Sequence, residues 1–176
     1  MAYRNKHDYS GECSFNGKRS EEVFRDLAVA RGFMVVDSSL TDQYKHTDFL
    51  IEKDGIIRKI DVKSRKKLKR SDKEPTDEYF WAEIQSVRGK EKSGWIYHSG
   101  GSAPEFVAFE MKEHFVIVSK LALQSLVEKY VDFEKFVDKA ADAHYTIYQR
   151  KGRKDMITLV ESSKLYDTNP IIWNKN

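Results

Sequence analysis

The dipeptide Asp54-Gly55, set between two runs rich in apolar residues, constrains the fold of this chain more than any other feature. An Asp-Gly pair in this setting is the strongest short-range signal for a β-hairpin with a two-residue turn, so strands are predicted at about 47–53 and 56–63. Counting back along both strands from that turn places Asp48 opposite Asp61. Opposed side chains have Cβ atoms roughly 4.5–5.5 Å apart, and like charges in such a pair are destabilising.

A lysine shares the predicted face with these carboxylates, because Lys63 lies two residues beyond Asp61. Hard divalent cations such as Mg²⁺ take oxygen ligands, commonly one or two carboxylates together with water and phosphate oxygens. A cation between Asp48 and Asp61 would relieve their repulsion, polarise a phosphodiester oxygen and lower the pKa of an attacking water. Lys63 would orient that water or stabilise charge that develops on phosphorus. The hairpin therefore predicts phosphodiester hydrolysis that depends on Mg²⁺ or Mn²⁺.

A solvated sheet face offers a simpler interpretation of the same charges. Strands with one face in water often carry Asp, Glu and Lys in cross-strand ion pairs, and spacing alone favours this interpretation. An Asp directly opposite an Asp argues against it, because a merely solvated face gains nothing from that pairing.

Six basic residues and no acid occupy the run from Lys63 to Arg70, directly after the hairpin. Such a run is commonly a solvated loop, but its position next to the carboxylates favours phosphate binding. The net charge of +3 is only a weak indication of an anionic partner. The residues expected to contact nucleic acid are Arg65, Lys66, Lys67, Lys69 and Arg70.

Hydrophobic periodicity along the chain predicts an α/β (α+β) fold with one mixed central sheet. We expect an N-terminal arm over residues 1–16 and a single domain over 17–176. Predicted helices cover Ser20–Arg31, with Ser20 as N-cap and Gly32 as the stop, and Leu121–Phe136. Beyond the hairpin and a polar loop at 64–78, strands are predicted at Phe33–Val36 (buried), Tyr79–Val87, Trp95–Tyr97, Phe106–Phe109, Phe115–Val118, Tyr145–Tyr148 and Met156–Val160.

The order of these features resembles the PD-(D/E)XK nuclease superfamily. Its pattern has an Asp on one strand and an Asp or Glu two residues before a Lys on the next, which Asp48 and Asp61-Val62-Lys63 match. Thr47 stands where the family usually has Pro. The preceding helix, entered through Gly17-Lys18-Arg19-Ser20-Glu21, is similar to that of archaeal-type Holliday-junction resolvases and related restriction-like nucleases. The resemblance is close over residues 17–63 and looser to about residue 118.

The resemblance implies a restriction-endonuclease-like core and a Mg²⁺-dependent deoxyribonuclease, with endonuclease activity expected. It also implies that Glu21 completes a metal site with Asp48, Asp61 and the Val62 carbonyl. The alternative for Glu21 is an acid that interacts with the helix dipole. Glu22 is a reserve ligand, while Glu83 and Gln85, on the strand predicted after the hairpin, are candidates for secondary roles in the site.

The remaining sequence features indicate the cellular compartment and the alternative functions. Cys13 is the only cysteine, which indicates a reducing compartment, and no apolar run approaches the ~20 residues of a membrane span. We therefore expect a cytoplasmic protein without a membrane partner, and nucleic acid, preferably DNA, as its substrate. A non-catalytic nucleic-acid-binding or accessory domain stays open as the alternative function. Relatives of this type often form homodimers, although the sequence carries no interface signature.

Overall fold

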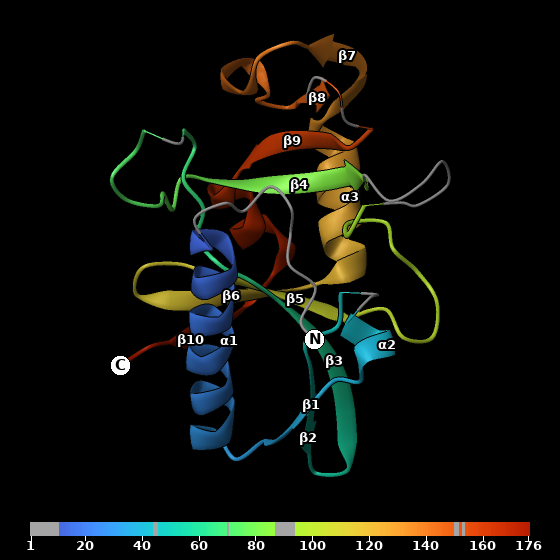
Figure 1. Ribbon diagram of the computed structural model, residues 1–176. Coiled ribbons are helices and arrows are strands. Elements are labelled where there is room, and N and C mark those ends of the chain that lie inside the picture. Colours follow the sequence, from blue (N-terminus) through green and yellow to red (C-terminus); the bar gives the residue numbers. More distant parts are fainter. Residues whose placement is uncertain (1–10, 44–45, 70, 87–93, 150–151, 153) are drawn as a thin grey trace.

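The computed structural model describes residues 11–43, 46–69, 71–86, 94–149, 152 and 154–176 (Figure 1). Its helices are α1 (Glu12–Ala30), α2 (Leu40–Gln43) and α3 (Lys120–Tyr130), with short 3-10 helices η1 (Ala140–Asp142) and η2 (Ser162–Thr168). Its strands are β1 (Met34–Asp37), β2 (Phe49–Lys53), β3 (Ile56–Lys63), β4 (Tyr79–Gln85), β5 (Phe106–Glu110), β6 (His114–Ser119), β7 (Asp132–Val137), β8 (Thr146–Gln149), β9 (Met156–Glu161) and β10 (Ile171–Asn174). Among the described residues, no helix is both long enough and apolar enough to cross a membrane.

These strands form two mixed sheets. The first has the order β1-β2-β3-β5-β6-β10 and the second has the order β4-β9-β8-β7. Strand β3 runs parallel to β5 and β7 runs parallel to β8, whereas the other neighbours are antiparallel. The predicted α/β fold with mixed strand directions is confirmed, but the strands divide between two sheets instead of joining one.

One face of the first sheet packs against α1. The buried side chains of Phe49, Ile51, Ile60 and Val62 form this core with Phe24 and Ala28 of the helix, and with Ala108, Phe115, Ile117 and Trp173. The ring centroids of Phe24 and Trp173 lie 5.2 Å apart. Alternate residues of β2 and β3 therefore supply the hairpin's apolar face.

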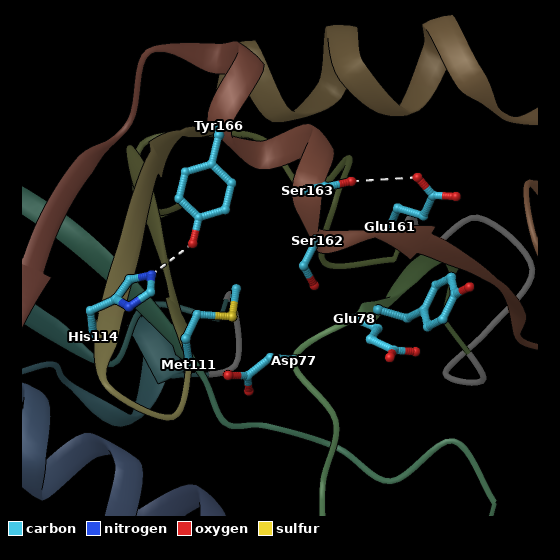
Figure 2. A pocket seen from close by; sticks show the side chains of 9 residues that line it. Asp77, Glu78, Met111, His114, Glu161, Ser162, Ser163 and Tyr166 are labelled. Atoms are coloured by element: carbon cyan, nitrogen blue, oxygen red, sulfur yellow. Dashed lines mark hydrogen bonds between the residues drawn. The ribbon is translucent and has the colours of Figure 1, made fainter.

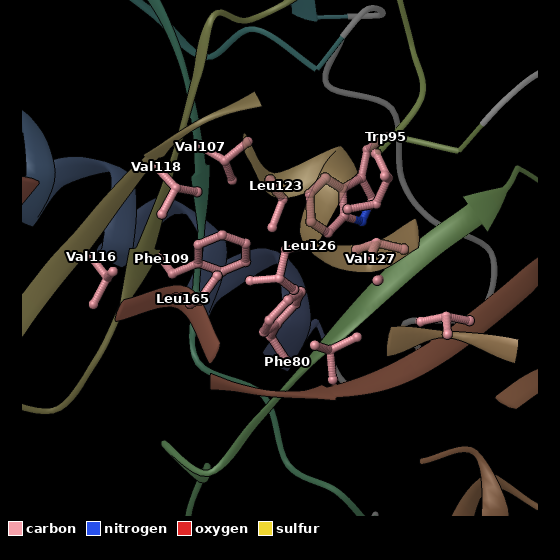
Figure 3. Close-up of a cluster of buried hydrophobic side chains, with 14 of the residues drawn as sticks. Phe80, Trp95, Val107, Phe109, Val116, Val118, Leu123, Leu126, Val127 and Leu165 are labelled. Atoms are coloured by element: carbon pink, nitrogen blue, oxygen red, sulfur yellow. The ribbon is translucent and has the colours of Figure 1, made fainter. Parts of the chain in front are cut away.

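The opposite face of the first sheet meets α3 and the second sheet (Figure 3). Val107 and Phe109 of β5 point into this core, where the Phe109 and Phe80 ring centroids lie 4.7 Å apart. Across the β3–β5 ladder, Asp61 pairs with Val107 and Lys63 pairs with Phe109. Because paired residues point to the same side of a sheet, Asp61 and Lys63 face the layer between the two sheets.

The first helix begins earlier than the sequence predicts. It starts at Glu12 with Gly11 at the N-cap, so Ser20 is a fully buried residue inside the helix and not its cap. Residues 12–16 of the predicted arm are therefore helical, while residues 1–10 lie outside the described residues. Gly32 follows the helix end with a φ of +80°, which confirms its predicted role as the stop.

Two predicted elements differ from the structure. Residues 95–97 form a turn and not a strand, because this segment bonds to the end of β4, where the Gly94 N–H donates to the Ile84 carbonyl at 2.8 Å. Helix α3 ends at Tyr130, six residues before the predicted end, and β7 follows. The Asp132 carboxylate accepts hydrogen bonds from the N–H groups of Glu134 and Lys135, a local pattern that competes with a continuing helix.

The edge position of β1 corrects another expectation. Its residues were expected to be buried, but Met34 is 57% and Val36 51% exposed because β1 pairs only with β2. The other short-range predictions agree with the structure. Strands β4, β6, β8 and β9 are present, and β8 pairs with β9 in an antiparallel hairpin. The described part of 64–78 contains no named strand or helix.

Candidate active site

The β2–β3 hairpin has the predicted register. Lys53 pairs with Ile56 and Phe49 pairs with Ile60, and both turn residues, Asp54 and Gly55, have positive φ as a type I′ turn requires. The ladder ends at Phe49, one residue before the predicted pairing of Asp48 with Asp61.

Asp48 does not continue the ladder but hydrogen-bonds to β3 through its N–H and its side chain. Its N–H donates to the Ile60 carbonyl at 2.8 Å, and its Oδ2 accepts from the Val62 N–H at 2.7 Å. The predicted pairing by register is therefore wrong in detail. The two carboxylates are nevertheless close enough for the negative charge of Asp61 to raise the pKa of Asp48, as described below.

Asp61 is almost completely buried, with 1% of its surface exposed. Its Oδ1 lies 2.7 Å from the Lys63 Nζ, whereas its Oδ2 is buried and has no hydrogen-bond partner in the described part of the chain. The Lys63 ammonium also lies 4.8 Å from the centroid of the Trp95 ring, a cation–π distance. Lysine thus contacts one oxygen of the buried carboxylate, whereas the other has no hydrogen-bond donor among the described residues.

Burial disfavours the charged form of both carboxylates, while a side-chain hydrogen bond with Asp48 lowers the pKa of Asp61. Burial raises the pKa of Asp48 well above its usual value, and the negative charge of Asp61 raises it further. Burial also raises the pKa of Asp61, against the opposing charge of Lys63. Two hard oxygen donors, one of them lacking a partner, fit the ligand preference of Mg²⁺ or Mn²⁺.

Glu21 lies at the margin of this cluster. Burial raises the pKa of Glu21, and the charge of Asp61 adds to the shift. In the described ranges, however, no group of three or more His, Cys, Asp and Glu side chains is arranged to hold a metal ion. The structure therefore brings together Asp48, Asp61 and Lys63 and leaves Glu21 within electrostatic range. Glu22, the reserve ligand, is exposed, and a ligand role for the Val62 carbonyl stays a prediction.

The strand next to β3 is β5 and not the one that carries Glu83 and Gln85. Both residues lie on β4, in the second sheet, because the chain crosses to that sheet after the 64–78 loop. The Glu83 carbonyl accepts from the Ile96 N–H at 3.4 Å. A secondary role in the site for Glu83 and Gln85 stays a prediction. The 94–98 turn, through Trp95, supplies a contact to Lys63.

Lys120 is a buried charge that the sequence did not indicate. It is the first residue of α3, is 6% exposed, and donates from Nζ to the His98 carbonyl at 2.6 Å. Burial lowers its pKa to about 8, and the charge of Lys63 acts in the same direction. A lysine in the first turn of an amphipathic helix is ordinarily exposed, so periodicity gives no signal for it.

The basic run after β3 is partly folded back on the protein. Arg65 pairs with Asp77 and donates to the Pro75 carbonyl at 2.9 Å, and the Lys67 Nζ lies 2.7 Å from a Glu12 oxygen. Lys66 and Lys69 are exposed, and Arg70 lies outside the described residues. The predicted phosphate contacts of Arg65 and Lys67 would therefore require these ion pairs to open.

A cavity of about 410 Å³ lies apart from the carboxylate pair and contains none of Asp48, Asp61 or Lys63 (Figure 2). His114 and Tyr166 form a hydrogen bond of 2.7 Å across one side of it. Three carboxylates contribute to its wall, which disfavours an anionic phosphate ligand. The residues around it are Asp77, Glu78, Tyr79, Met111, His114, Glu161, Ser162, Ser163 and Tyr166.

Comparisons with known proteins give little beyond this geometry. No protein-family model matches the sequence, and no curated protein matches it. Among solved structures, the chain is similar to the bacterial homing endonuclease I-Ssp6803I, with 19% sequence identity and a TM-score of 0.45. The match covers 64% of this chain and 72% of that one. A likeness at this level does not assign a family.

Proposed function

We propose that this protein is a metal-dependent nuclease that hydrolyses phosphodiester bonds, with DNA as its substrate. The observation that carries the proposal is the buried Asp61 carboxylate beside Asp48. Its Oδ1 contacts Lys63, and its Oδ2 has no hydrogen-bond donor within the described ranges. Such a group is costly in the metal-free protein, because a buried charge needs compensation. A divalent cation held by the two carboxylates would supply it.

Asp48 and Asp61 would hold Mg²⁺ or Mn²⁺, with Glu21 and the Val62 carbonyl as further candidate ligands. When bound, the cation supplies polarisation of a phosphodiester oxygen and a water of lowered pKa. The carboxylate of Asp48 is fixed for this role by the Val62 N–H, at 2.7 Å. These residues also reproduce the PD-(D/E)XK pattern, with Glu21 on the preceding helix.

Lys63 is the residue proposed to act on the reacting phosphate or water. Its ammonium is held between Asp61 Oδ1 and the Trp95 ring, and its side chain is 25% exposed. It is therefore fixed on one side and open on the other. From there it can orient the attacking water or stabilise negative charge on a phosphate oxygen. The exposed Lys66 and Lys69 would contact the DNA backbone nearby.

Cleavage of plasmid DNA by the purified protein in Mg²⁺, in Mn²⁺ and in EDTA tests the proposal. Asp61→Ala and Lys63→Ala should abolish metal-dependent cleavage, while circular dichroism shows that both variants remain folded. Lys53→Ala serves as a matched control, because it removes a lysine from the same hairpin at the end away from the site. Wild-type cleavage in both site variants would overturn the proposal.

A non-catalytic nucleic-acid-binding domain is the second candidate. It is favoured by the Lys63–Asp61 ion pair and by the lack of a three-residue metal cluster in the described ranges. Calorimetric titration with Mg²⁺ and Mn²⁺, with and without DNA, separates the two candidates. Binding that is lost in Asp61→Ala supports the nuclease, and no cation binding in either condition supports the alternative.

A further inference from the structure

The buried position of Lys120 needs an explanation that packing does not give. Burying an ammonium is unfavourable unless a carboxylate or several acceptors compensate for it. Lys120 Nζ donates to a neutral carbonyl, that of His98, and the Asp61 carboxylate that attracts it already contacts Lys63. The residue also begins α3, where the positive end of the helix dipole disfavours a cation. A charge kept at such a place is a candidate for function.

Lys120 is one of two α3 side chains that hold the 94–98 turn. Lys120 donates to the His98 carbonyl at 2.6 Å, and Gln124, one helical turn later, donates to the Ile96 carbonyl at 2.9 Å. On its other side the turn abuts β4 so closely that a Cβ on Gly94 would lie 2.0 Å from the Glu83 carbonyl oxygen. The turn is therefore fixed between α3 and β4.

The same turn supports Lys63. Trp95 is 7% exposed and its ring packs against Phe109 of β5, with the ring centroids 6.1 Å apart. The Lys63 ammonium lies 4.8 Å from the Trp95 centroid. Contacts thus run without a gap from Lys120 through the 94–98 turn to Lys63.

The charge of Lys120 also acts directly on the Lys63 ammonium. Its electrostatic neighbours are the Asp61 carboxylate, which attracts it, and the Lys63 ammonium, which repels it. Repulsion from a buried cation disfavours withdrawal of the Lys63 ammonium into the core. It keeps Lys63 at Asp61 Oδ1, on the open side of the site.

We propose that Lys120 is a positioning residue for Lys63, acting through the 94–98 turn and through its own positive charge. The inference rests on the proposed nuclease function, because Lys63 is the group that it serves. Gln124 makes the same kind of contact without a charge, so the chain contains its own control.

Three variants separate the hydrogen bond from the charge. Lys120→Met removes both, Lys120→Gln keeps a donor but removes the charge, and Gln124→Met removes only a neutral donor. We expect the single-turnover rate constant to fall about 10–100-fold in both Lys120 variants, the usual range for a residue that orients the primary groups of a site. DNA affinity should stay unchanged, and Gln124→Met should retain a rate constant close to wild type.

Two measurements on the metal-free protein distinguish positioning from a merely structural role. Lys120→Met should keep or raise the melting temperature, because it replaces a costly buried charge with an apolar side chain. A residue that only supported the fold would instead lower it. The Trp95 indole resonance in a ¹⁵N–¹H spectrum, assigned with Trp95→Phe, should shift in both Lys120 variants.

The outcomes also separate this inference from the proposed function. An unchanged rate constant in Lys120→Gln, or an unmoved Trp95 indole in Lys120→Met, overturns the inference even if the wild type cleaves DNA. A rate loss in Gln124→Met as large as that in Lys120→Gln overturns the role of the charge. If the wild type does not cleave but the indole moves, the coupling of Lys120 to the turn stands and the nuclease function falls. If Lys120→Met does not fold, the expectation for its melting temperature is wrong, and Lys120→Gln still supplies the rate constant and the Trp95 indole shift.

Discussion

Two buried carboxylates on neighbouring strands of the first sheet differ in how completely cationic side chains contact them. The Glu110 side chain, on β5, is fully buried, and Arg19 Nη2 contacts its Oε1 at 2.7 Å and its Oε2 at 2.9 Å. Lys175 adds a contact to Oε1 at 2.9 Å. Asp61, on β3, has Lys63 on one oxygen and no partner on the other within the described chain. One carboxylate is fully compensated and the other is left incomplete.

The contrast separates two uses of a buried charge. Arg19 belongs to α1 and Lys175 follows β10, so Glu110 ties the first helix and the last strand to the centre of the sheet. Among the described residues, Asp61 makes no ion pair with a distant segment, but it interacts with a second carboxylate, that of Asp48. Full compensation indicates a structural clamp, whereas incomplete compensation indicates a site that awaits a ligand.

The largest expected effect is on cleavage. Asp61→Asn should reduce Mg²⁺-dependent cleavage by on the order of 10³-fold or more, because it removes a charged ligand from the site that stabilises the transition state. Glu110→Gln should leave the activity of the folded protein unchanged. Single-turnover kinetics on supercoiled DNA, with folded protein counted by circular dichroism, measure both. Equal losses in the two variants would remove the functional distinction between the two carboxylates.

The next effect is on stability, where the Glu110 substitution should have the larger effect and the Asp61 substitution the smaller. Glu110→Ala should lower the free energy of unfolding by about 3 kcal/mol, because it leaves Arg19 and the partly buried Lys175 without their counter-ion. Asp61→Asn should cost much less, since the native carboxylate is itself poorly stabilised. Urea denaturation of the metal-free variants measures the difference. A larger loss in Asp61→Asn would show that Asp61, too, is structural.

The candidate site could be predicted from the sequence where it depends on local rules. Turn chemistry at Asp54-Gly55 determined the hairpin and its register, and alternation along β3 placed Asp61 and Lys63 on one face. The bend at Asp48 was missed because it depends on a side-chain bond to the Val62 N–H, which no residue pattern encodes. The positions of Asp61 and Lys63 were therefore predictable from local rules, whereas the conformation of Asp48 was not.

Long-range partners were not predictable in the same way. Trp95 and Lys120 reach the site only because β3 and β5 run in parallel and α3 packs behind them, an arrangement that periodicity does not specify. The Glu110 clamp joins residues far apart in the chain, and nothing in the sequence pairs them. The division into two sheets was missed for the same reason, since the sequences of β4, β8 and β9 do not specify the sheet to which each strand belongs.

The pH dependence of stability gives a smaller but more specific effect. The folded pKa of Asp48 is raised above the unfolded value of about 3.9, so the fold favours the protonated form. Its contribution to stability is present below the unfolded pKa and is lost as pH rises through the folded one. Asp48→Asn mimics the protonated state and keeps an acceptor for the Val62 N–H. It should raise the melting temperature of the metal-free protein at neutral pH and not at acidic pH.

Thermal melts across a pH series check this expectation. A gain of about 1 kcal/mol would raise the melting temperature by roughly 2–4 °C in a chain of this size. At neutral pH, saturating Mg²⁺ should give the wild type a higher melting temperature than Asp48→Asn, because only the wild type keeps both carboxylates for the cation. A destabilised Asp48→Asn at neutral pH without metal would show that the charged carboxylate is already well compensated, as that of Glu110 is.

The smallest expected effect extends the same distinction to the basic run after β3. Lys67 already has a partner in Glu12, at 2.7 Å, whereas Lys69 is exposed. A lysine that neutralises a phosphate releases about one counter-ion, so Lys69→Ala should reduce the slope of log affinity against log salt by about one. Lys67→Ala should change the slope less, because binding DNA with Lys67 first requires its ion pair to open. Fluorescence anisotropy with Ca²⁺ in place of Mg²⁺ measures both slopes. Equal changes would mean that a surface ion pair, unlike the buried clamp at Glu110, opens too easily to withhold a charge from the substrate.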